Sequence, residues 1–255
     1  MPTDLKVLAV IPARWASTRF PGKPMVMIKG RPMVQWVYER AKQAKLVDDV
    51  LVATDDDRIL SAVTNFGGKA VLTSPDHPTG TDRIAEAVRD INCDIVVNVQ
   101  GDEPLIPPEN IDCAVQCLMD DPSIPMSTLM TAIDNPDEFK DSNIVKVAVG
   151  KNGHALYFSR SPIPHNRDGS RIAGDKGCLG YKHIGLYVYK KTFLMKLNLL
   201  PEGDLEQVEK LEQLRVLENG YSIKVVVAPG TSIGVDCPKD LETVLKLIDS
   251  STSAT

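Results

Sequence analysis

Short apolar runs alternate with segments of helical spacing through the first half of the chain. The runs are rich in β-branched residues, and the segments between them repeat apolar residues every three or four positions. This alternation predicts a mainly parallel sheet with short right-handed crossovers. The expected strands cover 6–11, 49–54, 69–73 and 94–99. The expected helices are 32–45, one after Asp57 that ends near Phe66, one opened by residues 77–83, and 108–119.

The pattern changes after Pro125. Strands are expected at 126–133, 144–149 and 155–159, with no long helix between them, and an alternating strand follows at 182–189. This part of the chain therefore predicts a β-rich insertion or subdomain that could carry a second ligand or a dimer contact. The remaining elements are an amphipathic helix at 205–218, a strand at 222–228 and a final helix at 239–248.

These elements predict how the chain is divided. The length of 255 residues suits one large α/β domain, or one domain with a substantial insertion. We expect an α/β core over 1–125 and a subdomain over 126–222, inserted in the same fold. The chain is then expected to return to the core over 223–250, and 251–255 reads as a flexible polar tail.

Composition and charge exclude several classes of protein. The net charge of −5 argues against a general surface for nucleic acid or for anionic membranes, although it allows a local basic site. We find no apolar run of membrane length, and residues 1–4 lack the features of a secretory signal. The five cysteines are scattered, which favours reduced thiols and a cytoplasmic protein over a disulfide framework.

The richest chemistry lies in residues 11–24, IPARWASTRFPGKP, directly after the first expected strand. This loop carries Arg14, Arg19 and Lys23, holds no acid, and is restricted by three prolines. Open α/β sheets bind ligands at the carboxyl ends of their strands. Arginine forks and a lysine ammonium both match phosphate oxygens, so the loop predicts a polyphosphate site. A solvated basic loop is the structural alternative.

The loop does not match the common phosphate-binding motifs. Pro24 follows Gly22-Lys23 where a P-loop has serine or threonine. The first strand is not followed by Gly-x-Gly-x-x-Gly, so the dinucleotide-binding fingerprint is absent as well.

Two isolated acids follow expected strands. Asp102 lies at the end of the very apolar strand 94–99, where a carboxylate is costly unless it meets a cation or water. Because Gly101 already supplies the turn, we interpret Asp102 as a metal ligand. Asp236 stands in a similar turn, and its sequence context alone favours a cap for the final helix.

Two further motifs allow both a structural and a functional interpretation. Asp55 and Asp57 form an Asp-x-Asp, the metal motif of many glycosyltransferases, but acids that cap a helix explain them better. Gly80, Thr81 and Arg83 open a helix. They could offer backbone N–H groups and a hydroxyl to a base or phosphate, or form an ordinary N-cap.

The second half of the chain offers fewer candidates. Arg160 and Arg167 stand seven positions apart around two prolines. Residues 168–180 form a glycine-containing loop that is the best candidate for a mobile lid. His183 stands near the start of the alternating strand.

Seven motifs, in order, resemble those of the CMP-Kdo synthetases, the 3-deoxy-manno-octulosonate cytidylyltransferases. They are the opening loop, HPTGTDR, VNVQGDEP, YFSR-x-x-IP-x-x-R, KHIGLYVY, LEQLR-x-LENG and GVD-x-P-x-DL. The resemblance implies a three-layer α/β fold of the nucleotide-diphospho-sugar transferase type. Such a fold is Rossmann-like, with a mostly parallel mixed sheet and a β-rich subdomain for sugar binding and dimerisation.

The resemblance also implies a reaction. The anomeric hydroxyl of Kdo attacks the α-phosphorus of CTP, pyrophosphate leaves, and CMP-Kdo forms with the help of Mg²⁺. The implied pathway is lipopolysaccharide synthesis, and the implied assembly is a homodimer. Phosphoryl transfer depends mostly on positioning and on neutralising charge, which suits the cations and carboxylates of this chain.

The resemblance implies roles for individual residues by matching position. The catalytic residues are Arg14, Lys23 and Asp102, and the Mg²⁺ ligands are Asp102 and Asp236. The nucleotide-binding residues are Ala13, Arg14, Arg19, Lys23, Gly80, Thr81, Arg83 and Gln100. The sugar-binding residues are Gln100, Arg160, Arg167, His183, Glu212 and Gln213.

Three alternative functions stay open at this point. A CMP-sialic acid synthetase shares the opening loop, although LEQLR and KHIGLYVY favour Kdo. A glycosyltransferase would use Asp55 and Asp57. A regulatory domain without turnover would bind CTP and release no pyrophosphate.

Overall fold

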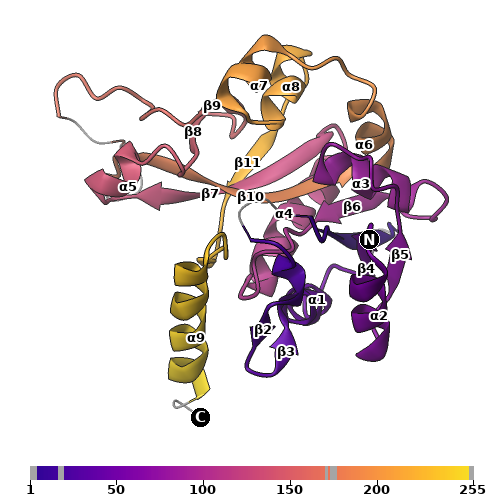
Figure 1. Cartoon of the computed structure of the whole chain (residues 1–255). Helices are drawn as coiled ribbons and strands as arrows, with labels where there is room; N and C mark the ends of the chain where they lie inside the picture. The colour runs from indigo at the N-terminus through magenta and orange to yellow at the C-terminus, as the bar shows by residue number, and fades with distance from the viewer. Residues whose placement is uncertain (1–4, 17–19, 170–171, 173–176, 253–255) are drawn as a thin grey trace. The chain divides into compact units, whose positions relative to one another are not determined.

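The chain divides into two units in the computed structural model, which describes residues 5–16, 20–169, 172 and 177–252 (Figure 1). One unit comprises residues 1–112 and 230–255, and the other comprises 113–229. The helix α4 (Pro108–Asp120) carries the chain from the first unit into the second. The functional division expected at residues 125 and 222 stays a prediction.

Parallel strands form the main sheet of the first unit, in the order β6-β1-β4-β5. They are β1 (Val7–Ala13), β4 (Asp49–Thr54), β5 (Ala70–Leu72) and β6 (Ile95–Asn98). The successive residues Ala9, Val10 and Ile11 of the central strand β1 are 0 % exposed, although their side chains alternate between the two faces of the sheet. Burial of both faces explains why these strands are continuous apolar runs. All lie where the sequence predicted them.

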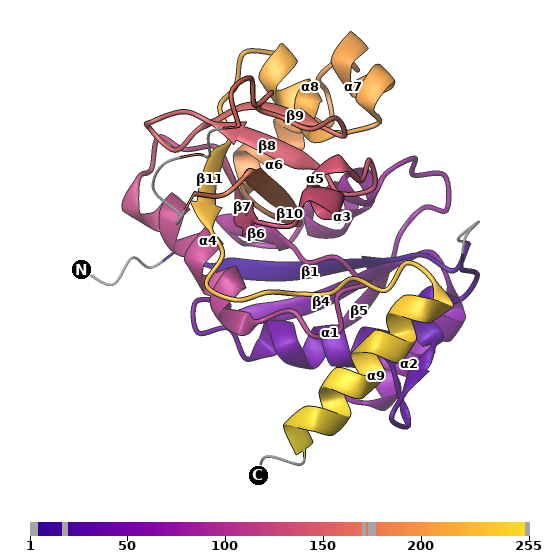
Figure 2. The same ribbon diagram turned by 90° about the vertical axis from the view of Figure 1, so that its left-hand side faces the viewer.

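Helices cover both faces of this sheet. The helices α1 (Met33–Lys42) and α2 (Asp57–Asn65) lie below the strands in both views, and α3 (Gly80–Val88) lies above them (Figures 1 and 2). The apolar stripe of α1 is buried, at Met33, Val34, Val37 and Ala41 among others. The first unit is therefore a three-layer arrangement.

The strand order creates a switch point between β1 and β6. From β1 the chain moves outward through β4 and β5, and it then returns to the other side of β1 as β6. Ligands bind in such a crevice, outside the carboxyl ends of the strands. A Cβ on Gly101 would lie 2.9 Å from the carbonyl oxygen of Pro12, so only glycine allows the turn after β6 to lie against the end of β1.

The C-terminal segment packs on the region after the opening loop. That region contains η1 (Lys23–Met25), β2 (Met27–Ile28) and β3 (Arg31–Pro32), and the C-terminal helix is α9 (Pro238–Thr252). One buried cluster joins Ile28 and Met33 to Val235, Val244 and Ile248. The predicted final helix is confirmed, and its burial fixes the residues just before it.

The second unit contains a mixed sheet, in which β7 lies between β10 and β11 and the β8–β9 pair extends from β10. β7 runs antiparallel to β10 and parallel to β11, and β8 runs antiparallel to both β10 and β9. The strands are β7 (Met126–Ile133), β8 (Lys146–Val149), β9 (Ala155–Ser159), β10 (Gly180–Lys190) and β11 (Lys224–Val227). The helices are α5 (Pro136–Lys140), α6 (Lys191–Leu197), α7 (Asp204–Glu209) and α8 (Gln213–Glu218).

Strands of both units belong to one nine-stranded sheet, which confirms the predicted α/β class with a mostly parallel, mixed sheet. The high content of β-strands expected after Pro125 is also found. None of the helices in the described part of the chain has both the length and the apolar character that a membrane span requires.

The single amphipathic helix predicted at 205–218 is wrong. The chain forms α7 and α8 instead, separated by Lys210 in the left-handed region at φ 54°. Leu205 and Val208 are 42 % and 82 % exposed, whereas Leu211 is buried, so the apolar stripe does not share one face. The spacing of apolar residues predicted one helix. In the folded unit only some of these residues are buried, and the segment forms two short helices.

Charged residues of this segment form contacts inside the second unit. Arg215 donates to both carboxylate oxygens of the buried Glu206, each at 2.7 Å. Glu209 accepts from the hydroxyl of Ser159 at 2.6 Å and from the backbone N–H of Arg160 at 2.9 Å. These charges therefore hold the unit together.

His183 lies in the interior of the second unit. Its Nε2 is 2.9 Å from the hydroxyl of Thr128, and its ring packs against Phe158 and Tyr187 with centroids 5.0 and 5.4 Å away. Burial lowers the pKa of His183 to about 3, because the charged imidazolium would lose its hydration.

This depressed pKa predicts acid sensitivity. An unfolded imidazole takes up a proton below about pH 6.5, whereas His183 in the folded protein stays neutral down to about pH 3. The contribution of His183 to stability is therefore full at pH 7 and is lost as the pH falls, by about 2 kcal/mol at pH 5. We expect His183→Gln to reduce the drop in unfolding free energy between pH 7 and pH 5, measured by urea denaturation.

The exposed His165 provides the matched control. His165→Gln should leave the difference between the two pH values as it is in the parent protein. An unchanged difference in His183→Gln would contradict the prediction.

Candidate functional site

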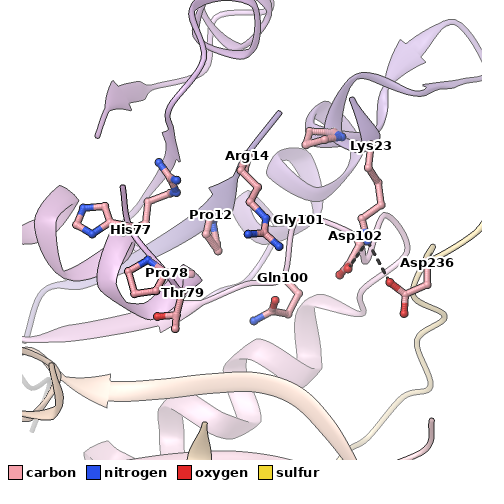
Figure 3. A pocket seen from close by; sticks show the side chains of 14 residues that line it. Pro12, Arg14, Lys23, His77, Pro78, Thr79, Gln100, Gly101, Asp102 and Asp236 are labelled. Carbon is pink, nitrogen blue, oxygen red and sulfur yellow. Dashed lines mark hydrogen bonds and ion pairs between the residues drawn. The ribbon is translucent and has the colours of Figure 1, made fainter. Parts of the chain in front are cut away.

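A cavity of about 410 Å³ opens in the first unit where β1 and β6 end (Figure 3). Its size is that of a small-molecule site. The residues that line it come from the opening loop, the segment before α3, the turn after β6 and the segment before α9. They are Pro12, Ala13, Arg14, Lys23, Pro24, His77, Pro78, Thr79, Gly80, Arg83, Gln100, Gly101, Asp102 and Asp236.

Lys23 lies between two carboxylates in this cavity. Its Nζ is 2.7 Å from Oδ2 of Asp102 and 3.2 Å from Oδ1 of Asp236 (Figure 3). The Lys23 side chain is 16 % exposed, whereas Asp236 is 57 % exposed. The structure therefore brings together three residues that the sequence predicted for one site, from segments far apart along the chain.

Local structure holds this triad in place. Gly22 adopts φ 68° as the cap of η1, a conformation that favours glycine, and this turn places Lys23 at the cavity. The backbone N–H of Val235 donates to the carbonyl oxygen of Asp102 at 2.8 Å. Asp240 accepts from the N–H groups of Asp236 and Cys237, each at 2.9 Å. Asp240 thus caps the start of α9, and the Asp236 carboxylate is left to face Lys23.

The chemistry of the two acids suits a hard divalent cation. Both carboxylates already converge on one ammonium, which stands where a cation would bind. The described residues contain no cluster of three or more histidine, cysteine or acidic ligands. Mg²⁺ commonly takes only one or two carboxylates, and water and substrate phosphates complete its shell, so the residues fit this ion.

Arg14 and Gln100 face the same cavity from the ends of β1 and β6 (Figure 3). Arg14 is exposed, and it forms no ion pair with any residue that the structure describes. Its guanidinium can therefore receive an anion. Gln100 donates from Nε2 to Oδ1 of the buried Asn98 at 3.1 Å, which fixes the orientation of its amide.

The segment that opens α3 both caps the helix and lines the cavity, the two roles that the sequence analysis left open. Thr79 is the N-cap, because its hydroxyl accepts from the N–H of Asp82 at 3.1 Å. Gly80 lines the cavity, whereas Thr81 is buried. Arg83 lines the cavity too, but its guanidinium donates to Asp55 at 2.8 Å and is 3 % exposed. Arg83 is thus neutralised before any ligand arrives.

The acidic triplet 55–57 has a structural role. Asp56, which stands between the two acids of the Asp-x-Asp, caps α2 by accepting from the N–H of Arg58 at 2.9 Å. Asp55 pairs with Arg83, and Asp57 is exposed in the first turn of α2. None of the three lines the cavity.

Sequence reasoning named only part of the cavity wall. His77, Pro78 and Thr79 also line it, and His77 contacts the carboxylate of Glu86 through Nε2. The hydrogen bond from His77 is the main reason why the pKa of Glu86 lies below its usual value. The signal was available, because these residues precede Gly80 in the same HPTGTDR motif.

The predicted sugar-binding residues other than Gln100 belong to the second unit. Arg160 donates from Nε to the carbonyl oxygen of Glu209 at 2.9 Å and from a terminal nitrogen to that of Ser142 at 3.1 Å. Arg167 is 90 % exposed, and its side chain lies 4.0 Å from that of Asp168. These contacts leave their sugar role a prediction.

Helix α8 and strand β10 carry the rest of this set. Glu212 stands at the N-cap of α8, and Gln213 follows it as a buried residue. Tyr187 packs against one member of the set, His183, and burial raises the pKa of the Tyr187 hydroxyl. No role was predicted for Tyr187, although it belongs to the KHIGLYVY motif.

Two expectations fall on residues that the structure does not describe. Arg19 lies outside the described residues, as do most of the residues at the centre of the expected lid 168–180. In the part of that loop which is described, Ile172 forms an isolated bridge with Cys178.

The chain is similar to known cytidylyltransferases over nearly its whole length. A family model described as cytidylyltransferase matches residues 8–224. The chain is 53 % identical over 243 residues to a 3-deoxy-manno-octulosonate cytidylyltransferase of Syntrophotalea carbinolica, covering 93 % of this chain and 96 % of that protein. It is 54 % identical over 247 residues to the protein of the same name from Geotalea uraniireducens, covering 95 % and 98 %.

Comparison with solved structures gives the same family. A CMP:2-keto-3-deoxy-manno-octonic acid synthetase complexed with CTP superposes with a TM-score of 0.90 at 44 % identity, covering 96 % of this chain and 99 % of the other. A 4-diphosphocytidyl-2C-methyl-D-erythritol synthase of Anaerococcus prevotii shares the fold at a TM-score of 0.64 and 14 % identity, with 96 % of each chain covered. The resemblance found in the sequence motifs is confirmed. The chain therefore belongs to the cytidylyltransferase family, and within it to the 3-deoxy-manno-octulosonate cytidylyltransferases.

Proposed function

We propose that this protein transfers CMP from CTP to the anomeric 2-hydroxyl of Kdo. The oxygen of that hydroxyl forms a bond to the α-phosphorus, the bond from the α-phosphorus to the bridging oxygen breaks, and pyrophosphate leaves as the hydroxyl proton is lost. The product, CMP-Kdo, is an activated sugar for lipopolysaccharide synthesis. The family membership and the strong likeness to a synthetase complexed with CTP support this reaction.

The observation that carries the proposal is the triad of Lys23, Asp102 and Asp236 at the switch point of the sheet. It lies in one cavity with Arg14. Phosphoryl transfer requires positioning and charge neutralisation more than it requires covalent catalysis. Cations for the triphosphate and carboxylates for a metal ion are the groups that such a site needs.

The side chains of this site would act by exchanging partners. Arg14 offers the triphosphate a guanidinium that can bind two oxygens at once. Lys23 would leave the carboxylates for the phosphates, which adds positive charge where negative charge develops in the transition state. The segment 77–83 would border the nucleotide, since His77, Gly80 and Arg83 line the same cavity.

Asp102 and Asp236 would hold Mg²⁺ once Lys23 has turned to the phosphates. When bound, the ion would neutralise charge on the transferring phosphoryl group and favour deprotonation of the attacking hydroxyl. The fit rests on two carboxylates that converge on one cation position.

The sugar would be bound by Gln100 and by Arg160, Arg167, His183, Glu212 and Gln213 of the second unit. His183 is neutral at physiological pH because its pKa is lowered to about 3, so it would offer a hydrogen bond and not act as a base. We also propose that the protein is a homodimer in the cytoplasm. Five free cysteines suit a reducing compartment.

The first test is pyrophosphate release from CTP with Mg²⁺, with Kdo and sialic acid in parallel. We expect release with Kdo alone, and EDTA should abolish it because the carboxylates need a metal to act on the phosphates. Release with sialic acid in place of Kdo would overturn the sugar assignment. The absence of release with either sugar would overturn the proposed reaction.

Removing a predicted metal ligand should slow turnover strongly. We expect Asp102→Asn and Asp236→Asn each to lower kcat by about 100-fold or more, because the metal loses one of two charged ligands. Both variants should also bind Mn²⁺ more weakly, as measured by electron paramagnetic resonance. Asp57→Asn is the control, and we expect it to retain activity within about two-fold because Asp57 only stabilises a helix start.

Substitution of Lys23 should have opposite effects on turnover and on metal binding. Lys23→Met removes a cation that the triphosphate uses, so kcat/KM for CTP should fall about 100-fold. In the absence of CTP the same variant should bind Mn²⁺ more tightly than the parent, because the ammonium no longer neutralises Asp102 and Asp236. Weaker Mn²⁺ binding would show that Lys23 does not compete with the metal.

A further inference from the structure

Trp15 lies between a cation and a glycine in the opening loop. The guanidinium carbon of Arg58 is 3.3 Å from the centroid of the Trp15 ring. On the loop side, a Cβ on Gly22 would lie 3.3 Å from the indole, so the ring packs closely on the Gly22 backbone. The N–H of Gly22 also donates to the carbonyl oxygen of Trp15 at 3.1 Å. Trp15 therefore joins Arg58 to the residue that directly precedes Lys23.

Asp56 fixes the cation that covers Trp15. Arg58 donates from Nε and Nη2 to the two carboxylate oxygens of Asp56, at 2.8 and 2.6 Å. This bidentate pair sets the plane of the guanidinium, which a single contact would not do. Asp56 is itself the N-cap of α2. The ring of Trp15 is thereby attached to the start of a helix.

Asp55 connects Trp15 of the opening loop to Arg83 of α3, which lines the cavity. Its Oδ1 accepts from the backbone N–H of Trp15 at 3.3 Å, and its Oδ2 accepts from Arg83 at 2.8 Å. Arg83 also donates to the hydroxyl of Thr73 at 2.5 Å and to the carbonyl oxygen of Ser74 at 3.3 Å. One carboxylate thus joins the opening loop to the first turn of α3.

We infer that Asp55, Asp56, Arg58 and Trp15 form a positioning clamp for the nucleotide. Trp15, Asp56 and Arg58 do not line the cavity. They act on the described ends of the opening loop, where Trp15 follows Arg14 and Gly22 precedes Lys23, while Asp55 acts through Arg83. Cations whose neighbouring backbone is held in place before binding lose less conformational entropy when the triphosphate arrives. This inference rests on the proposed function, since it takes CTP as the ligand of the cavity.

The clamp predicts a selective loss of nucleotide affinity. Because Arg58 is 59 % exposed, Arg58→Ala should fold normally. We expect it to raise KM for CTP by about 5- to 10-fold, while KM for Kdo changes less than about two-fold. Trp15→Ala should have the same selective effect, and Trp15→Phe should restore most of the affinity because an aromatic ring still packs under the guanidinium.

The chain contains a matched control. Arg31 covers Trp36 at 5.4 Å and pairs with Glu39 at 2.9 Å, which repeats the arrangement of arginine, tryptophan and acid away from the cavity-lining residues. Arg31→Ala should leave both KM values within about two-fold of the parent values. If Arg31→Ala raised KM for CTP as much as Arg58→Ala does, the effect would be general and the clamp would be wrong.

CTP binding without Kdo separates the clamp from the reaction. Trp15 and Trp36 are the two tryptophans of the chain, so Trp36→Phe leaves Trp15 as the sole indole reporter. In that background, Arg58→Ala should weaken the Kd for CTP, followed by Trp15 emission or by calorimetry, about 5- to 10-fold. The Arg58→Ala, Trp15→Ala double variant, measured by calorimetry, should lose no more affinity than Trp15→Ala alone, because the two residues act as one unit.

These measurements test the clamp and the proposed function separately. If the parent binds CTP and Arg58→Ala binds it equally well, the clamp is overturned and the proposed function stands. If the parent does not bind CTP at all, the proposed function fails, and the clamp loses its ligand with it. Equal losses for CTP and Kdo, with a lower melting temperature, would show that these residues only stabilise the fold.

Discussion

Two carboxylates that would repel each other are held side by side by one ammonium. Asp102, Asp236 and Lys23 come from the turn after β6, the segment before α9 and the opening loop. Much of the first unit serves this contact. Gly101 lets the end of β6 approach β1, and the N–H of Val235 bonds to the backbone of Asp102. The apolar cluster under α9 includes Val235, so it holds the backbone next to Asp236 in place.

The same charges explain how an acidic chain can bind a polyanion. Most of the cavity cations are neutralised in advance, Lys23 by two acids and Arg83 by Asp55. The ion pairs of Lys23 are only partly buried, since Asp236 is 57 % exposed, and such pairs can exchange partners without unfolding the protein. Lys23 is thus an adaptable contact, whereas the buried pair of Arg83 and Asp55 is a fixed one. Arg14 is the cation that the described residues leave available.

The sequence predicted the sheet of the first unit and the centre of its site well, for a physical reason. Buried parallel strands such as 94–99 must be apolar, and an acid placed directly after one, as Asp102 is, needs a cation. Both signals are local. The pairing of Arg83 with Asp55 and the packing of Trp15 under Arg58 were not predicted. They depend on residues that meet only after folding, and no spacing rule connects them.

In the second unit, local sequence patterns predicted the structure less well. The residues of 205–218 have helical spacing, yet Lys210 interrupts the helix because Glu206 pairs with Arg215 inside the unit while Val208 is exposed. Tertiary contacts overrode local preference there. The sugar-binding residues expected in this unit were read from a family resemblance, and most of them are engaged by contacts within the unit.

The position of Asp236 along the chain has a consequence for biosynthesis. The strands, Lys23 and Asp102 are all complete by residue 112, but Asp236 follows only after the second unit, 113–229, has been made. A nascent chain therefore carries the opening loop and one carboxylate for most of its synthesis without the partner acid. It can bring the two carboxylates together only after the segment that contains Asp236 and α9 has emerged and α9 has docked. Translation order thus delays the pairing of the two carboxylates until the second unit has been made.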